Sequence, residues 1–278
     1  MALKLMYITN NTEVAQIAQI AGVDRIWVDM EFIGKDDRQA GMDTVKSRHT
    51  VEDIRKIKPY ITSAELLVRV NPVHTAVPSY PDTREEIEEA IAAGAEILML
   101  PMFKSKSEVA YFLECVNGRA KTQLLFETAE AVENIEDILS LPGIDEVHIG
   151  LNDLHLAYGR KFMFELLCGD VVRDLCRIFR ERGLPYGFGG IARVGFGLLP
   201  AEYVIAEHYH LGSTAAILSR SFCNANRVDD PNTVKDIFVE GVRNIRAKED
   251  EVSRFTEAQY RENLDIIRSK VEGIVASL

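Results

Sequence analysis

The amino-acid sequence predicts an α/β fold in which eight parallel strands close into a TIM-type (β/α)8 barrel, followed by additional helices. Short apolar runs alternate with longer amphipathic segments along most of the 278 residues, as expected for βα units around a parallel sheet. The strand-like runs are almost continuously apolar, which is typical of strands buried on both faces. Eight such units fit within about 220 residues, which favours a closed barrel.

The expected strands are short runs rich in aliphatic and aromatic residues, at 3–8, 25–30, 65–70, 96–100, 123–126, 147–150, 186–191 and 215–219. The expected helices carry apolar residues three and four positions apart, at 13–21, 51–60, 82–93, 106–116, 131–141, 170–182 and 201–207. We expect Thr50 to be the N-cap of the second helix. Gly94 and Gly183 should end the third and the sixth.

The residues after the eighth strand form an extension. We expect a catalytic barrel over residues 1–225 and a helical extension over 226–278. Two segments of the extension, 232–246 and 259–275, place apolar residues on one helical face, and such a face must be buried. Two alternatives remain open: the helices cap their own barrel, or they are docked on or exchanged with a partner subunit.

Composition and charge exclude several classes of function. A net charge of −11 argues against a nucleic-acid-binding or anionic-membrane-binding surface. No segment approaches the ~20 apolar residues of a membrane span, and the N-terminus lacks the pattern of a signal peptide. The four cysteines, Cys115, Cys168, Cys176 and Cys223, form no C-x-x-C pair. Three of them lie in apolar helical stretches or beside a strand, as reduced core thiols do, which indicates a cytoplasmic protein.

Two carboxylates follow neighbouring strands. Glu127 comes directly after the run 123–126, and Asp153 follows the run 147–150. Catalytic residues of such barrels lie at the carboxyl ends of the strands, so these side chains should converge. Like charges held close together favour a cation between them, and carboxylate oxygens are good ligands for Mg²⁺ or Mn²⁺. Each acid could instead cap the following helix, but two at adjacent strand ends favour a metal site.

The same rim should carry further acids and one arginine. Asp29 and Glu31 end the second strand, and Arg69 ends the third. Arg69 could hold a carboxylate or an enolate oxygen through a bidentate contact. It could equally be a structural ion-pair partner of Asp29 or Glu31.

The segment 32–48 is long for a βα connection and rich in charge, which is typical of a lid or binding loop. His49 lies at its end, beside a helix N-terminus. A lone histidine is commonly a capping or solvated residue, but its position at the mouth keeps His49 a candidate proton carrier. His208 and His210 are expected in the loop before the last strand, without a third ligand, and therefore not as a metal site.

Six sets of residues in this order resemble the HpcH/HpaI aldolase family, the class II pyruvate-type aldolases related to citrate lyase β-subunits and malyl-CoA lyases. The similarity covers roughly residues 20–220. The matching motifs are Val28-Asp-Met-Glu31, Val68-Arg-Val70, Ala93-Gly-Ala with Leu100-Pro-Met102, Phe126-Glu-Thr128, Val132-Glu-Asn with Leu141-Pro-Gly-Ile-Asp145, and Ile149-Gly-Leu-Asn-Asp-Leu154.

The resemblance implies that Glu127 and Asp153 bind Mg²⁺, Mn²⁺ or a similar ion, which chelates pyruvate or another 2-oxo acid. Arg69 would stabilise the enolate. The substrate-binding candidates are Pro101, Met102 and Asn152, together with Arg69. The family also exchanges a C-terminal helix between subunits, commonly in trimers of dimers, so the resemblance favours a homo-oligomer.

Two departures from the family pattern concern proton transfer. Phe32 stands where the family usually carries a histidine, and Leu151 and His155 replace a proline and a serine after the sixth strand. Cleavage still needs a group that removes the hydroxyl proton. Metal-bound water relayed by Asp29 or Glu31 is one alternative. Our hypothesis is that His49 replaces the missing imidazole.

We therefore expect a divalent-metal-dependent carbon–carbon lyase that cleaves a 2-oxo-4-hydroxy acid into a 2-oxo acid and an aldehyde. One alternative is a Claisen lyase or thioesterase of the citrate-lyase or malyl-CoA type, although the acidic chain shows no obvious basic cluster for a CoA tail. The other is a metal-binding barrel without the usual base, which would serve in assembly or regulation.

Overall fold

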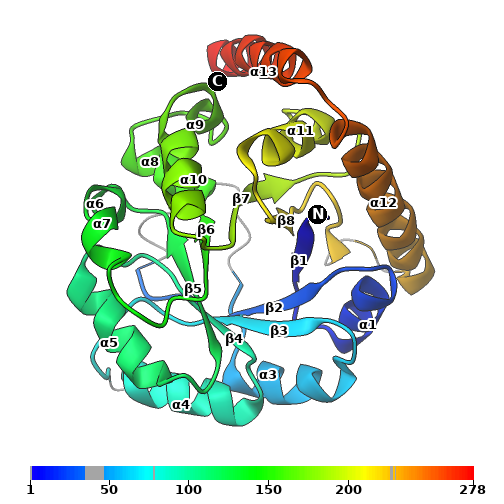
Figure 1. Cartoon of the computed structure of the whole chain (residues 1–278). Helices are drawn as coiled ribbons and strands as arrows, with labels where there is room; N and C mark the ends of the chain where they lie inside the picture. The colour runs from blue at the N-terminus through cyan, green and yellow to red at the C-terminus, as the bar shows by residue number, and fades with distance from the viewer. Residues whose placement is uncertain (1, 35–46, 78, 226–227, 229) are drawn as a thin grey trace.

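A computed structural model describes residues 2–34, 47–77, 79–225, 228 and 230–278 and shows eight parallel strands closed into a barrel (Figure 1). Each strand pairs with the next along the chain, and the first pairs with the last. The strands are β1 (Lys4–Ile8), β2 (Arg25–Asp29), β3 (Glu65–Arg69), β4 (Ile97–Leu100), β5 (Lys121–Phe126), β6 (Glu146–Ile149), β7 (Tyr186–Ile191) and β8 (Ala215–Leu218). The predicted (β/α)8 barrel is confirmed.

Helices form a ring around this barrel (Figure 1). They are α1 (Thr12–Ile20), α3 (Val51–Ile57) with the 3-10 turn η1 (Lys58–Tyr60), α4 (Thr83–Ala93), α5 (Lys106–Val116), α6 (Ala129–Glu133), α7 (Ile135–Ile138), α8 (Leu151–Ala157), α9 (Glu165–Cys168), α10 (Val171–Glu181), α11 (Ala201–Leu211), α12 (Pro231–Val252) and α13 (Glu257–Ser277). None of the helices in the described part of the chain is long and apolar enough to cross a membrane.

The predicted helix ends are confirmed where capping chemistry is strong. Thr50 is the N-cap of α3, and its backbone N–H donates to Asp53 Oδ2 at 2.8 Å. Gly94 ends α4 at φ +109°, a left-handed conformation that favours glycine. Gly183, at φ +69°, follows α10 in the same way.

Two predicted segments differ from the structure. The helix expected over 131–141 is the short pair α6 and α7, which meet at Asn134, whose side chain donates to the Lys104 carbonyl at 3.1 Å. The helix expected over 201–207 continues to Leu211. His208 and His210 therefore lie on α11, and the prediction that they lie in a loop is wrong. The helix stops only at Gly212, the residue that can adopt φ +73°.

The interior of the barrel holds two kinds of contact. Its apolar part is a cluster of inward-facing side chains: Met6, Trp27, Leu67, Ile97, Met99, Leu125 and Ala215. Toward the amino ends of the strands, the fully buried Arg25 forms a bidentate pair with Glu146 at 2.6 and 2.7 Å and a third contact with Glu65 at 2.9 Å. This ion-pair cluster joins β2, β3 and β6 across the barrel.

The C-terminal helices lie on the outside of their own barrel in this single chain. α12 packs against α1 and α11, and α13 packs against α11 and α9 (Figure 1). Their buried hydrophobic residues are Val234, Phe238, Val242, Ile245, Val252, Leu264, Ile267 and Val271. The apolar faces predicted from the sequence are therefore covered, while exchange of this extension with a partner subunit stays a prediction.

The buried ion-pair cluster gives a test of barrel stability. We expect Arg25→Met to lower the free energy of unfolding by about 3–5 kcal/mol, because it leaves the Glu146 carboxylate buried without its partner. Arg25→Met combined with Glu146→Leu should recover most of this loss. The control Arg177→Met breaks an exposed pair with Glu181 and should cost less than about 1 kcal/mol. Urea denaturation at neutral pH measures all three; equal stability of the two single variants would contradict the expectation.

The same cluster predicts a pH dependence. Burial by itself raises the pKa of Glu146, but the hydrogen bonds and charge of Arg25 outweigh it and hold that pKa below 4.5. A carboxyl whose pKa is lowered by folding stabilises the protein above its unfolded pKa and loses this effect as the pH falls through its folded pKa. The stability difference between wild type and Arg25→Met should therefore narrow below pH 4.5.

Candidate functional site

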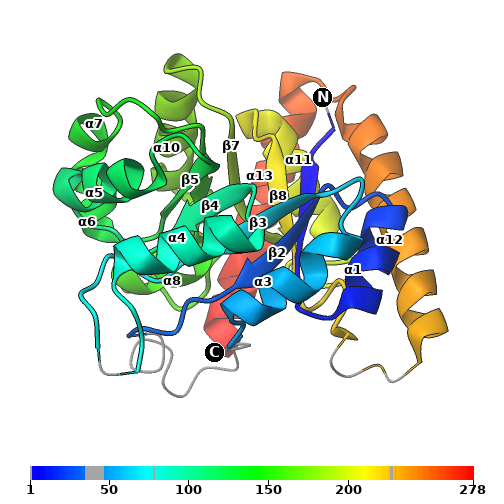
Figure 2. The same cartoon turned by 90° about the horizontal axis from the view of Figure 1, so that it is seen from below.

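A cavity of about 310 Å³ lies at the carboxyl ends of the strands. Its walls come from residues at or just after the ends of β1, β2, β3, β6, β7 and β8, and from the residue that follows β5. Figure 2 shows the barrel from the side, with the N-terminus at one end and the C-terminus at the other. We call this space the first cavity. It is where the sequence predicted the catalytic rim.

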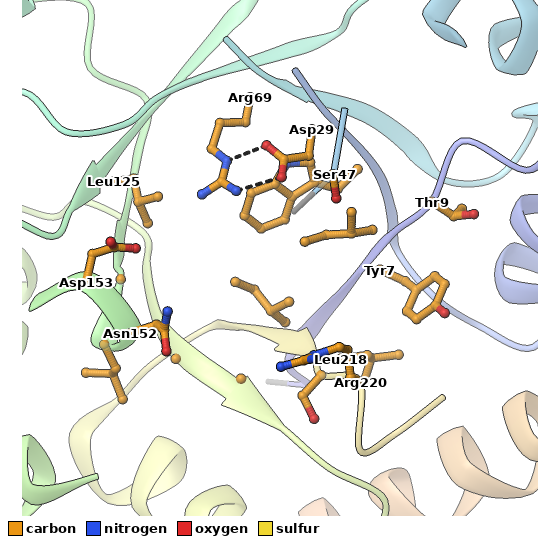
Figure 3. Close-up of a pocket in the computed structure, with 18 of the residues that line it drawn as sticks. Tyr7, Thr9, Asp29, Ser47, Arg69, Leu125, Asn152, Asp153, Leu218 and Arg220 are labelled. Atoms are coloured by element: carbon orange, nitrogen blue, oxygen red, sulfur yellow. Dashed lines mark hydrogen bonds and ion pairs between the residues drawn. The ribbon is translucent and has the colours of Figure 1, made fainter. Parts of the chain in front are cut away.

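The predicted metal pair lies on this cavity. Glu127 follows β5 and is 3% exposed, and Asp153 lies in the first turn of α8. Both line the first cavity, and Figure 3 shows Asp153 on the same cavity as Arg69, with Leu125 between them. Glu127 Oε1 accepts a hydrogen bond from the Met102 backbone N–H at 3.1 Å, which orients the carboxylate.

Gly150 allows Glu127 to occupy this position. The β5–β6 register places Phe126 opposite Ile149, so the next residues of the two strands, Glu127 and Gly150, are also adjacent. A Cβ atom on Gly150 would lie 2.6 Å from Glu127 Oε2 and 2.8 Å from its Cβ, closer than real Cβ contacts. The absence of a side chain at position 150 therefore creates the space for the carboxylate.

Arg69 is held by two acids at the mouth. The β2–β3 register puts Asp29 directly opposite Arg69, and the two form a bidentate pair at 2.7 and 2.8 Å (Figure 3). Arg69 Nη1 also lies 3.2 Å from Glu31 Oε2, and the guanidinium lies 5.1 Å from the centre of the Trp27 ring. Burial alone lowers the pKa of Arg69, but the charges of Asp29, Glu31 and Glu127 outweigh it and raise the pKa above its usual value.

Both readings of Arg69 therefore hold at once. It is an ion-pair partner of Asp29 and Glu31, and it also lines the first cavity. The three contacts with the acids use only part of the five N–H donors of a guanidinium. The side chain can thus keep its structural partners and still donate to a bound anion.

A buried amide positions the loop that follows β2. Asn71 Oδ1 accepts hydrogen bonds from the backbone N–H groups of Phe32 and Ile33 at 2.9 and 3.0 Å. Asn71 Nδ2 donates to Glu86 on α4 at 2.8 Å, and Tyr80 also donates to Glu86 at 2.9 Å. Burial raises the pKa of Glu86, although these hydrogen bonds act to lower it. Asn71 was not identified from the sequence as part of the site.

His49 also lines the first cavity, but one nitrogen of its ring already takes part in a hydrogen bond. Its Nδ1 accepts the backbone N–H of Asp29 at 3.0 Å, so Nδ1 carries no proton in this arrangement. A neutral ring then has its proton on Nε2 and is a hydrogen-bond donor there. His49 can remove a substrate proton through Nδ1 only after it releases Asp29. The structure therefore brings His49 to the mouth without showing it as a base.

The remaining predicted residues are divided between the cavity and its support. Asn152 lines the first cavity. Glu31, Pro101 and Met102 do not line it; the Met102 N–H is directed at Glu127, at a backbone φ of +54°. The predicted lid over 32–48 falls mostly on residues 35–46, which lie outside the described residues.

Several polar residues of the first cavity were not identified from the sequence, among them Thr9, Asn10, Ser47 and Arg220. Thr9 and Asn10 follow β1, and Arg220 follows β8; Figure 3 shows Arg220 on the side of the cavity opposite Arg69. Reading every strand end for polar residues, including the first and the last, would have found these three. Ser47 is buried and also lines the cavity, but it precedes α3 in a long connection and had no such signal.

The donor set of the cavity suits a hard divalent cation. Within the described residues, no group of three or more His, Cys, Asp and Glu side chains could hold a metal ion. Magnesium needs fewer protein ligands than that, because it keeps several waters and is commonly bound by one or two carboxylates together with its substrate. Glu127 and Asp153, with the amide of Asn152 beside them, are oxygen donors of the kind that Mg²⁺ and Mn²⁺ prefer.

Known proteins resemble this chain in sequence and in fold. A stretch of 78 residues is 40% identical to a hydroxypyruvate/pyruvate aldolase of Rhizorhabdus wittichii, and it covers 25% of this chain and 31% of that protein. An HpcH/HpaI aldolase/citrate lyase family protein from Burkholderia cenocepacia has a similar fold, with a TM-score of 0.61 at 14% identity over 79% of this chain and 90% of that one. An HpcH/HpaI aldolase from Desulfitobacterium hafniense gives 0.58 at 17% identity, over 88% and 93%.

The family itself is identified by sequence. The model of the HpcH/HpaI aldolase/citrate lyase family matches residues 4–163, which is more than half of the chain. This range includes the ends of β1 to β6 and with them Asp29, Arg69, Glu127 and Asp153. The chain therefore belongs to the HpcH/HpaI aldolase/citrate lyase family.

Proposed function

We propose that this protein is a divalent-metal-dependent aldolase that reversibly cleaves a 2-oxo-4-hydroxy acid into pyruvate, or a related 2-oxo acid, and an aldehyde. Family membership supports aldolase or lyase chemistry, and the similar stretch in a hydroxypyruvate/pyruvate aldolase supports a small 2-oxo acid. The observation that carries the proposal is one cavity lined by Glu127, Asp153 and Arg69. Two carboxylates can bind a divalent metal ion, and the arginine can stabilise the negative charge of an enolate.

Each side chain has a task in this reaction. Glu127 and Asp153 would hold Mg²⁺ or Mn²⁺, with Asn152 beside them. The ion would act as a Lewis acid toward the carboxylate and keto oxygens of the 2-oxo acid. Arg69, kept in place by Asp29 and Glu31, donates to the oxygen on which negative charge develops as the C3–C4 bond breaks.

Proton transfer falls to Asp29 in this proposal. Cleavage moves the electron pair of the C3–C4 bond into the enolate and the C4 hydroxyl proton to a base. Asp29 lines the first cavity, whereas Glu31 does not, and His49 Nδ1 is occupied by the Asp29 N–H. We therefore place Asp29 ahead of His49 as the group that relays this proton.

The metal proposal predicts exchange of the C3 protons of pyruvate with solvent. Proton NMR in D₂O should show exchange with added Mg²⁺ or Mn²⁺, loss of exchange with EDTA, and recovery when metal is restored. Glu127→Gln should abolish exchange, because it removes one charged ligand. The control Glu130→Gln alters an exposed partner of Lys104 and should behave as wild type. Exchange that persists in EDTA and in Glu127→Gln would contradict the metal site.

The contact between Gly150 and Glu127 predicts a change in metal affinity. Gly150→Ala should weaken Mn²⁺ binding by about tenfold or more, because the new Cβ displaces the carboxylate that would bind it. Gly169→Ala is the control, since a Cβ there meets nothing within 4 Å. Isothermal titration calorimetry gives both affinities, and equal values would mean that Glu127 is not a ligand.

The proton relay separates Asp29 from His49. We expect Asp29→Asn to lower kcat by about 10²-fold or more and His49→Ala to lower it less, because the Asp29 carboxylate lines the cavity whereas His49 Nδ1 already accepts the Asp29 N–H. The assay follows cleavage of 4-hydroxy-2-oxopentanoate, with pyruvate detected by a coupled reaction. A larger loss in His49→Ala would instead support our hypothesis from the sequence, in which His49 releases Asp29 and acts as the base.

A further inference from the structure

A second cavity of about 510 Å³ adjoins the first one. The two share Asn152, Met163, Gly190, Ser219 and Arg220 as lining residues, so the second cavity begins where the first one ends. The proposed reaction occupies only the first cavity with its 2-oxo acid and its reacting carbonyl. The second cavity is larger and has no task in that reaction.

The walls of the second cavity are mainly apolar. The connection between α8 and α9 contributes Phe162, Met163 and Phe164, the segment after β7 contributes Ala192, Leu198 and Leu199, and α11 contributes Val204. The charged residues of its lining, Lys161 and Arg220, are exposed and therefore lie where the cavity meets solvent. Such a surface favours an uncharged body of aromatic or alkyl character.

One polar side chain of this lining is deeply buried. His155 on α8 is 4% exposed, and its Nδ1 lies 3.2 Å from the Leu151 carbonyl oxygen. A carbonyl can only accept, so the proton of the neutral ring is on Nδ1 and Nε2 is an acceptor. Within the described residues Nε2 has no hydrogen-bond partner, and it is not enclosed by protein atoms. A buried acceptor that lines a cavity selects a ligand with a donor.

We propose that the second cavity binds the substituent of the aldehyde, an aromatic or branched alkyl group that carries a hydroxyl, and that His155 Nε2 accepts the hydrogen bond of this hydroxyl. The inference rests on the proposed aldolase function and names its aldehyde class. His155 touches only the remote end of the substrate, so it determines specificity and takes no part in bond cleavage. It stands where the family pattern more often has serine, a side chain too short to present an acceptor at the same place.

The experiment compares aldehydes in the condensation with pyruvate. Acetaldehyde fills only the first cavity, whereas 4-methylbenzaldehyde also needs the second. Ala192→Leu places a larger side chain in the second cavity and leaves the first one unchanged. It should lower kcat/KM for 4-methylbenzaldehyde by about tenfold or more and leave kcat/KM for acetaldehyde within about twofold. Val204→Phe fills the same space from α11 and serves if Ala192→Leu does not fold. Leu156→Ala is the control, because Leu156 adjoins His155 in sequence but lines neither cavity.

The role of His155 is tested with matched aldehydes. Wild type should prefer the 3- or 4-isomer of (hydroxymethyl)benzaldehyde to the corresponding methylbenzaldehyde by about tenfold. His155→Leu should remove this preference, and His155→Gln, which keeps an acceptor oxygen, should retain part of it. Unchanged preference in His155→Leu would overturn the role of His155.

Failure of this inference is distinguishable from failure of the proposed function. If acetaldehyde is converted but filling the second cavity leaves 4-methylbenzaldehyde unaffected, the inference is wrong and the aldolase function stands. If no aldehyde is converted, the aldolase function fails, and with it the assignment of an aldehyde. Saturation-transfer NMR with 4-methylbenzyl alcohol then tests whether the second cavity binds a ligand. Binding that Ala192→Leu abolishes supports a ligand site there, and absence of binding to the wild type overturns that site.

Discussion

The guanidinium of Arg69 is the charge on which the mouth of this barrel depends. Asp29 and Glu31 are each only 2% exposed in their side chains, and Glu127 is almost as buried. Three carboxylates this close to one another would repel without a cation among them. Arg69 supplies that cation with short contacts to two of them, and its guanidinium also lies over the Trp27 ring. The acids are therefore held together at the place where the first cavity needs them.

Other parts of the rim depend on backbone as much as on side chains. The backbone N–H of Met102 donates a hydrogen bond to Glu127, and Gly150 leaves the space that the Glu127 side chain occupies. Asn71 connects β3 and α4 to the loop after β2 through hydrogen bonds in which both ends of its amide take part. The carboxylates that would bind a metal and the arginine that would meet an enolate are thus fixed by different strands. Such a preorganised arrangement favours stabilisation of developing charge over adaptation to the substrate.

In the proposed reaction, the first and second cavities would divide the substrate between them. The 2-oxo acid and the reacting carbonyl would meet charged groups at β2, β3, β5 and α8, whereas the remainder of the aldehyde would meet the apolar connections around β7, α9 and α11. Loops tolerate sequence change more readily than strand ends do, so specificity can vary while the reaction centre stays the same. His155 departs from the family pattern on the same helix as Asp153, only two residues after it.

The sequence by itself determined the barrel, the helix caps and the strand ends that carry Asp29, Arg69, Glu127 and Asp153. Strands buried on both faces have a continuous apolar pattern, and caps have local chemistry, so both can be read along the chain. Only the tertiary structure decided which polar groups meet: the bidentate contact of Arg69 with Asp29, the acceptance of the Asp29 N–H by His49, and the second cavity beside the first. These depend on strand register and on segments far apart in the chain. No local pattern encodes the distance between them.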